Sequence, residues 1–273
     1  MRQGMLKKPS ALVARQLQVQ MGRREILREV EFSCDPGLVG LLGKNGAGKT
    51  TLLKSLLMLC PHQSGQILLK PQEGEELDLA GLSRRERARH MAYVPQELPP
   101  AVHAAVLEFV VMGRTPYLGW LAVPKAADYQ RAREALAGLQ MEQLSERFLD
   151  QLSGGERKLA YLARARVQQA EWMLLDEPSA SLDFERQHQF FRLLCDSLRA
   201  GGDGALVTIH DPLLAYQYCD QILILEEGRL TASLKKTDPA FEEQYGKELE
   251  RLYGRRAVFA DTSEGKTIVW RRD

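Results

Sequence analysis

The chain has 273 residues, and its 37 basic and 36 acidic side chains leave a net charge of +1, which gives no argument for a nucleic acid partner. The length suits one large domain or two small ones, and no apolar run reaches the ~18 residues of a membrane span. The basic start lacks the apolar segment of a secretion signal. Cys34, Cys60, Cys195 and Cys219 lack C-x-x-C spacing, which disfavours a disulfide framework or a zinc site and suits buried thiols in a reducing cytoplasm.

The first predicted elements are strands. Residues 11–34 alternate apolar and polar around the sequence MGRRE and predict an antiparallel hairpin. Leu38–Leu42 is a short apolar run typical of a buried parallel strand. A helix is predicted over 51–60, where leucines recur at helical spacing before Pro61. A glycine-rich turn therefore joins a buried strand to a helix.

That turn carries the pattern G-x-x-x-x-G-K-[ST] at Gly43, Gly48, Lys49 and Thr50. Glycines let the loop wrap tightly with several N–H groups turned inward, and the following helix adds the positive end of its dipole. The pattern predicts a bound polyphosphate. Lys49 is expected to reach the β- and γ-phosphates, and the Thr50 hydroxyl to bind Mg²⁺.

The middle of the chain changes from strands to helices. Residues 66–70 and 91–96 read as strands, separated by a helix that opens at the capping box Ser83-x-x-Glu86. Helical periodicity follows over 105–113, then a loop over 114–124 and a charged amphipathic helix over 125–139. This pattern predicts a helical insertion into an α/β framework.

A second anion site is predicted where the next helix begins. Ser153 and Glu156 form another capping box, and Gly154 and Gly155 leave the N–H groups of the helix start uncovered. A capping box alone is an ordinary structural feature. The double glycine is not required by capping, so this helix start is expected to bind a phosphate.

Two adjacent carboxylates follow the predicted strand Trp172–Leu175. Asp176 and Glu177 would lie at its carboxyl end, where open α/β sheets bind ligands. Asp176 is expected to hold Mg²⁺ directly or through water. Glu177 is then free to orient and deprotonate an attacking water.

The rest of the chain returns to α/β alternation. A helix is predicted over 183–202, a strand over 205–210 that ends at His210, and a hairpin over 221–230. A helix over 240–254 and a terminal hairpin, whose turn TSEG joins 257–261 to 266–270, complete the chain.

Together these motifs resemble the nucleotide-binding subunit of an ATP-binding cassette (ABC) transporter over nearly the whole chain. The resemblance implies a Walker A loop at 43–50, a Q-loop glutamine at Gln96, a family signature at 152–156 and a Walker B strand ending in Asp176 and Glu177. It also implies a D-loop, SASLD, that ends at Asp183, and a switch histidine at His210. The residues implied to contact ATP are Gly43, Asn45, Gly46, Ala47, Gly48, Lys49, Thr50, Thr51, Met21, Ser153, Gly154, Gly155, Glu156 and Asp183. The catalytic set implied is Lys49, Gln96, Glu177 and His210, and the Mg²⁺ ligands are Thr50, Gln96 and Asp176.

In this family two subunits stack head to tail, so the resemblance implies a dimer in which each ATP lies between one chain's Walker loop and the other's signature helix. The expected fold is an α/β P-loop NTPase (RecA-like) core with an N-terminal antiparallel β subdomain and a helical insertion. One cassette domain would span 1–273, with the core over 1–95 and 161–230 and the helical signature subdomain over 96–160. An appendage over 231–273 would either pack on the core or regulate or support the dimer.

One residue departs from the family pattern. Met21 stands where many relatives carry an aromatic residue that stacks on adenine. A thioether offers no π-face, so the adenine contact would be weaker or shared with another residue. The alternative is that Met21 belongs to the core.

Within the family the chain is most similar to importer subunits that energise uptake of iron-siderophores, haem or cobalamin. The stretches that carry this similarity are VLEFVVMGRTPYLG, KAADYQRAREAL, DEPSASLDFERQ and LERLYGRRAVF. It implies a separate polytopic membrane permease, an indirect link to a substrate-binding protein, no nucleic acid, and a peripheral place on the cytoplasmic face of the inner membrane.

Two further interpretations concern partners. Tyr117, Leu118 and Trp120 either anchor the permease or close the core of the helical subdomain. A soluble cassette ATPase that acts as an assembly or translation factor is the alternative function. A hydrolytically inactive binding module is disfavoured because Lys49, the Walker B carboxylates Asp176 and Glu177, and His210 are all present.

Overall fold

The computed structural model describes residues 10–60, 63–180, 182–263 and 265–271. The basic N-terminus, the predicted helix stop at Pro61, Ser181 of the D-loop motif and Glu264 of the last turn lie outside the described residues.

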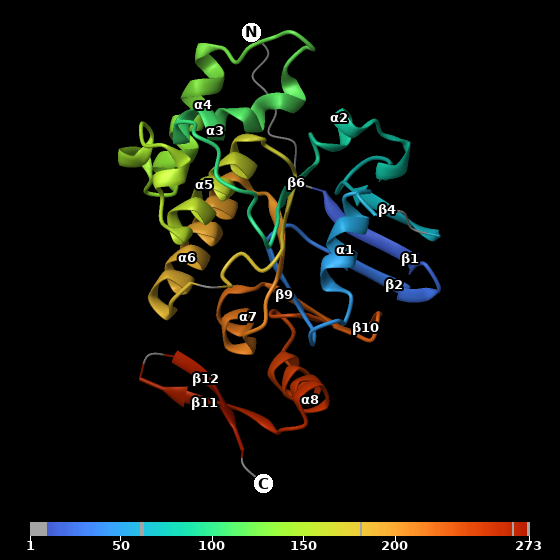
Figure 1. Ribbon diagram of the computed structural model, residues 1–273. Helices are drawn as coiled ribbons and strands as arrows, with labels where there is room; N and C mark the ends of the chain where they lie inside the picture. Colours follow the sequence, from blue (N-terminus) through green and yellow to red (C-terminus); the bar gives the residue numbers. More distant parts are fainter. Residues whose placement is uncertain (1–9, 61–62, 181, 264, 272–273) are drawn as a thin grey trace.

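The predicted strand Leu38–Leu42 (β3) lies inside a six-stranded sheet with the order β10-β9-β3-β8-β7-β6 (Figure 1). Its strands are parallel except for the edge strand β10, which pairs with β9 as the predicted hairpin. Parallel strands covered on both faces read as continuous apolar runs, which explains this sequence pattern. The other five strands are β6 (Met91–Val94), β7 (Trp172–Leu175), β8 (Gly204–Thr208), β9 (Gln221–Glu226) and β10 (Arg229–Lys235).

A smaller antiparallel sheet holds the N-terminal strands, in the order β2-β1-β4-β5. The predicted hairpin is confirmed, with β1 over Ala11–Met21 and β2 over Arg24–Cys34. The strand predicted at 66–70 is β4 (Ser64–Lys70), which joins this sheet instead of the larger one. The short strand β5 (Leu77–Asp78) was not predicted.

The helix α1 (Lys49–Leu56) fills the space between the two sheets. Its leucines share one apolar cluster with residues of β1, β2 and β4 and with Val39 and Leu41 of β3. Leu38 and Leu42 point to the opposite face, because successive side chains of a strand alternate. The chain is therefore built around two cores, one on each face of the large sheet.

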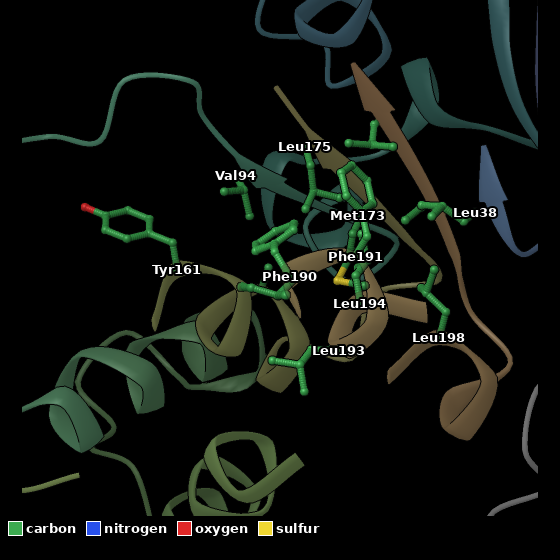
Figure 2. Packing of buried hydrophobic residues seen from close by; sticks show 14 of the residues in the cluster. Leu38, Val94, Tyr161, Met173, Leu175, Phe190, Phe191, Leu193, Leu194 and Leu198 are labelled. Carbon is green, nitrogen blue, oxygen red and sulfur yellow. The ribbon is translucent and has the colours of Figure 1, made fainter. Parts of the chain in front are cut away.

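The second core covers the other face of the large sheet. The helix α6 (Phe184–Gly201) lays Phe190, Phe191 and Leu194 against Met173 and Leu175 of β7 (Figure 2). Its predicted bounds are close to correct because Asp183 caps its start and Gly202, with φ of 71°, ends it.

The helical insertion packs beside this core (Figure 1). The helix predicted over 105–113 ends earlier, and the chain continues through a 3₁₀ turn instead of entering a loop at 114. The proposed subdomain boundary at 160 falls inside a continuous helix. The elements of the insertion are α3 (Val106–Val111), η2 (Met112–Tyr117), α4 (Ala126–Gly138), the 3₁₀ turns η3 (Glu142–Leu144) and η4 (Leu149–Gln151), and α5 (Gly154–Val167).

Two helices of the structure, α1 and α7 (Pro212–Tyr218), differ from the sequence prediction. The helix predicted over 51–60 begins at Lys49 and ends at Leu56, because Gly48 turns the chain with φ of 107° and Met58 adopts φ of 55°. The helix α7 was not predicted, although Asp211 accepts the Leu213 N–H at 2.7 Å and proline occupies the first turn. The helix predicted after Ser83 is confirmed as the single turn α2 (Arg84–Arg87), which follows the 3₁₀ turn η1 (Leu79–Gly81).

The tail packs on the end of the large sheet. Its helix α8 (Phe241–Tyr253) buries Tyr245 and Leu249 in the second core, and Phe259 of the terminal hairpin packs against the same cluster. The strand β10 runs to Lys235, so the proposed appendage from 231 includes residues of the main sheet. The terminal hairpin pairs β11 (Ala257–Thr262) with β12 (Gly265–Trp270), as predicted.

Among the described residues, the helices are either too short or too polar to cross a bilayer.

Candidate functional site

The glycine-rich loop between β3 and α1 has the backbone of an anion site. A Cβ at Gly43 would lie 2.3 Å from the Leu225 carbonyl oxygen, so only glycine fits there. Gly46 and Gly48 have φ of 79° and 107°, conformations that favour glycine. Gly48 is the N-cap of α1 and makes no side-chain cap hydrogen bond, which leaves the first N–H groups of α1 for another acceptor.

Lys49 lies folded over this loop. Its side chain is buried, and Nζ donates to the carbonyl oxygens of Gly43 at 2.7 Å and Lys44 at 3.2 Å. Burial lowers the pKa of Lys49, while the charges of Glu177 and Asp176 oppose that shift. The ammonium is therefore held on the loop by two carbonyl groups, and the charges of both carboxylates act on it. Thr50 and Thr51 follow in the first turn of α1 and are partly buried, whereas Asn45 is exposed and Ala47 is buried.

Asp176 is suited to a metal ion. It follows β7, is 1% exposed, and its backbone N–H donates to the Val94 carbonyl at 2.9 Å. Its Oδ1 accepts a hydrogen bond from Thr208, but its buried Oδ2 has no partner within the described part of the chain. A buried carboxylate oxygen without a partner is costly, and a hydrated Mg²⁺ would satisfy it. Burial, with the neighbouring Asp176 carboxylate, raises the pKa of Tyr93 to about 12.

Glu177 gathers side chains from two neighbouring strand ends. Gln96 follows β6 and donates from Nε2 to Glu177 Oε2 at 2.8 Å, and His210 follows β8 and pairs through Nε2 with Oε1. Since β6, β7 and β8 are adjacent parallel strands, their carboxyl ends meet at one edge of the sheet. The amide N–H of Gln96 is engaged with Glu177, so only its amide oxygen could ligate a metal.

The second predicted anion site is at the exposed start of α5. Ser153 Oγ accepts the Glu156 N–H at 3.3 Å, and the Ser153 N–H donates to Glu156 Oε2 at 2.8 Å, which confirms the capping box. A cavity of about 250 Å³ opens beside it, lined in part by Ser153, Gly155 and Arg186. No residue of the glycine-rich loop lines this cavity, so the structure of one chain does not bring the two predicted anion sites together there.

The remaining predicted site residues have plainer surroundings. Asp183 accepts the Arg186 N–H at 2.9 Å as the N-cap of α6. Gly154 is exposed in the first turn of α5. Met21 ends β1 and is 47% exposed, so the interpretation of this residue as part of the core is wrong.

Three residues that support the site were not predicted. Thr208 donates to Asp176 and accepts the backbone N–H of Glu177. Lys158 of α5 donates to the Ala180 carbonyl in the loop after β7. The N–H of Gly228 donates to the Ala47 carbonyl of the glycine-rich loop at 3.0 Å. Burial lowers the pKa of Lys158, and the charge of Glu177 opposes that shift. Of these three residues, only Gly228 could have been found from the sequence, because it lies in the turn of a predicted hairpin.

All four cysteines are free, three of them are buried and Cys195 is partly buried. No group of three or more His, Cys, Asp or Glu side chains in the described ranges could hold a metal ion by itself.

Comparison with known proteins identifies the family. The ABC transporter pattern matches residues 27–180 of this chain. The chain belongs to the ABC transporter family. The predicted family, the P-loop fold and the ATPase activity with ATP as its nucleotide are thereby confirmed, and the motifs can be given their family names.

Relatives extend this match over almost the whole cassette. The hemin import ATP-binding protein HmuV of Bordetella pertussis is 35% identical over 272 residues, covering 96% of this chain and 99% of that protein. A Helicobacter pylori ATP-binding protein assigned to iron chelatin transport is 35% identical over 225 residues, covering 80% of this chain and 85% of that one. A chain of an inward-facing transporter assigned to the metal-chelate type superposes with a TM-score of 0.78 at 26% identity and covers 96% of both chains.

Proposed function

We propose that this chain is the ATP-hydrolysing subunit of an ABC importer that works through a separate membrane permease, with a metal chelate such as haem or an iron-siderophore as cargo. The observation that carries the ATPase site is the convergence of Gln96 and His210 on Glu177, beside the Walker A lysine. The full-length similarity to a hemin import protein supports the importer class. An ATPase subunit does not touch the cargo, so the cargo rests on the relatives' names.

Different residues of the chain bind the phosphates, orient Glu177 and accept the proton of the attacking water. The uncapped N–H groups of α1 and the Lys49 ammonium would bind the phosphates, whose negative charge replaces the carbonyl contacts that Lys49 now makes. Gln96 and His210 hold both oxygens of Glu177, which orients the carboxylate toward the γ-phosphate side. Water then attacks the γ-phosphorus, the bond to the bridging oxygen breaks, and Glu177 takes the proton of the water, giving ADP and phosphate.

Mg²⁺ fits this site because Asp176 Oδ2 is buried without a partner. Thr50, Asp176 and the amide oxygen of Gln96 are the residues that would hold it. When bound, the ion neutralises phosphate charge and orients the β- and γ-phosphates.

A dimer of this chain would complete the site. The start of α5 is exposed and capped by its own side chains, and the glycine-rich loop lies elsewhere on the chain, so each can serve one half of a shared nucleotide site. In this arrangement the γ-phosphate joins Lys49 of one chain to Ser153 and Gly155 of the other, with Asp183 near the same boundary.

The permease contact is assigned to the loop after η2. Trp120 is 97% exposed, and Leu121 and Val123 beside it are also exposed, an unusual concentration of apolar surface. Tyr117 instead lies against Arg114, with its ring centre 4.0 Å from the guanidinium carbon. Tyr117 therefore packs on the subdomain and Leu118 is partly buried, whereas Trp120 cannot close the subdomain core and is free for a partner. A permease partner would place the subunit at the cytoplasmic face of the membrane, with a substrate-binding protein reached only through the permease.

Purification from membranes tests this function. We expect the chain to co-purify with a polytopic permease, and Trp120→Glu to weaken that association while leaving the ATPase activity of the isolated chain intact. Val269→Glu, a matched change at an exposed apolar residue of β12, is the control and should keep the permease. Association with a wholly soluble partner would favour an assembly or translation factor instead.

A further inference from the structure

The hydroxyl group of Thr208 in β8 is not explained by the apolar residues that precede it in the strand. Thr208 is the last residue of the strand and 1% exposed, and it follows the buried apolar residues Leu206 and Val207. A valine would continue that run with the same shape, so the hydroxyl needs a separate reason.

The strand register brings this hydroxyl to the Walker B acids. Leu174 pairs with Leu206 and Leu175 with Val207, so Thr208 stands beside Asp176 where the two parallel strands end. Its Oγ1 accepts the Glu177 backbone N–H at 2.6 Å and donates to Asp176 Oδ1 at 3.0 Å. A backbone N–H can only donate and a carboxylate oxygen accepts, so the single hydroxyl proton is committed to Asp176.

Both hydrogen bonds of Thr208 involve groups that the proposed ATP hydrolysis uses. Glu177 has φ of 45°, a backbone conformation that non-glycine residues rarely adopt and that surrounding contacts must maintain. The bond to its N–H helps to hold this turn, which directs the carboxylate to Gln96 and His210. The bond to Asp176 Oδ1 leaves Oδ2 as the buried oxygen without a hydrogen-bond partner among the described residues, which a metal ion could satisfy.

We propose that Thr208 is a positioning residue of this ATPase, whose hydroxyl fixes the metal-binding carboxylate and the water-activating carboxylate relative to each other. The proposal rests on the proposed function of the site. The β8 segment then serves the site twice. His210, which follows the strand, contacts Glu177, and Thr208, the last residue of the strand, positions Asp176 and Glu177 without touching the nucleotide.

Thr208→Val tests the hydroxyl while keeping the β-branched shape, and Thr208→Ser restores it without the methyl group. We expect Thr208→Val to lower kcat about 10- to 100-fold, since two hydrogen bonds at charged or strained groups are lost, with the KM for ATP changed less than about threefold. Thr208→Ser should stay within about threefold of the natural chain. Thr231→Val is the matched control, because Thr231 donates to the Ile224 carbonyl at 3.2 Å on the edge strand β10 of the same sheet.

Metal dependence provides a readout independent of turnover. Binding of a fluorescent ATP analogue, titrated with Mg²⁺ and repeated in EDTA, should show an Mg²⁺ requirement about 3- to 10-fold higher in Thr208→Val and unchanged binding in EDTA. Thermal unfolding of each variant checks that it folds.

The outcomes separate the possibilities. A kcat and Mg²⁺ requirement for Thr208→Val within threefold of the natural chain would overturn the proposal. Equal losses in Thr208→Val and Thr208→Ser would also overturn it, because they would show that restoring the hydroxyl does not restore function. If Thr208→Val does not fold, Thr208→Ala removes the same hydroxyl, and failure of both to fold would make the role structural and overturn the proposal. A natural chain that binds ATP without hydrolysing it would contradict the proposed function, while the Mg²⁺ titration would still test Thr208.

Discussion

Two helices of this chain begin beside glycines, and they treat their first N–H groups in opposite ways. At the start of α1, Gly48 makes no side-chain cap, and Lys49 is buried in the first turn. At the start of α5, Ser153 and Glu156 form a complete capping box, and the helix start is exposed.

This difference in capping favours separate roles for the N-termini of α1 and α5, as the two halves of one shared nucleotide site. N–H groups without a side-chain cap, together with a buried lysine, make an anion site that one chain can form alone. A helix N-terminus that is already capped and open to solvent binds a ligand tightly only when another surface supplies the remaining contacts. The comparison therefore predicts that changes at α1 abolish nucleotide capture, whereas changes at α5 affect pairing of two chains.

The largest effect is expected from Lys49→Ala. The ammonium neutralises the crowded β- and γ-phosphates, and alanine supplies no charge, so both ATP binding and hydrolysis should be lost. Equilibrium binding of a labelled ATP and phosphate release measure this. Lys54→Ala, on an exposed position of the same helix, should retain both activities. Normal hydrolysis in Lys49→Ala would show that the loop is not the nucleotide site.

Glu177→Gln should separate binding from chemistry. Glutamine keeps the size of the side chain but cannot accept the proton, so hydrolysis should fall by a factor of about 10² to 10⁴ while ATP binding survives. Trapped ATP should then hold two chains together, and light scattering should detect a shift from monomer to dimer when ATP is added. A variant that binds ATP yet stays monomeric, even in the complete complex with the permease, would contradict the shared site.

Ser153→Arg, added to the Glu177→Gln chain, tests the α5 half of the comparison. The larger charged side chain should block ATP-driven pairing and leave ATP affinity of the isolated chain within about twofold, because Ser153 serves the partner's nucleotide. Ser83→Arg is a closely matched control, since Ser83 makes the same capping box with Glu86 at α2. Loss of pairing in both variants would point to a general effect of losing a cap or adding charge.

The smallest effect is expected at Met21, the exposed residue at the end of β1 where the family pattern places the adenine contact. Met21→Tyr should tighten ATP binding by about 1 kcal/mol, or roughly fivefold, if the new ring stacks on adenine. Titration with ATP and with a base-free triphosphate measures the contribution of the base. Equal affinity of the natural chain and Met21→Tyr for ATP would remove residue 21 as the adenine contact.

Much of the fold was predictable because the signals act over a few residues. The hairpin of β1 and β2, the buried strand β3, and the capped starts of α2, α5 and α6 appear where the pattern placed them. The start of α1 was predicted two residues late, since leucine spacing marks the buried face of a helix and not its first turn. The strand β5, of two residues, is too short for any periodicity to reveal.

The sequence by itself determined the parts of the site whose function depends on local chemistry. Gly46 and Gly48 shape the phosphate loop through their own backbones, and Ser153 caps its helix through a residue three positions on. Such interactions need no distant partner, so a pattern of residue types is enough to predict them.

Only the tertiary structure decided how the catalytic groups meet. Gln96 lies 81 residues before Glu177, and His210 lies 33 residues after it, and they converge because β6, β7 and β8 are neighbours in the sheet. Thr208 looks like any β-branched strand residue until the register sets it beside Asp176. Strand order and register depend on how whole faces of the sheet are buried against helices far away in the chain, and no short stretch of sequence contains that information.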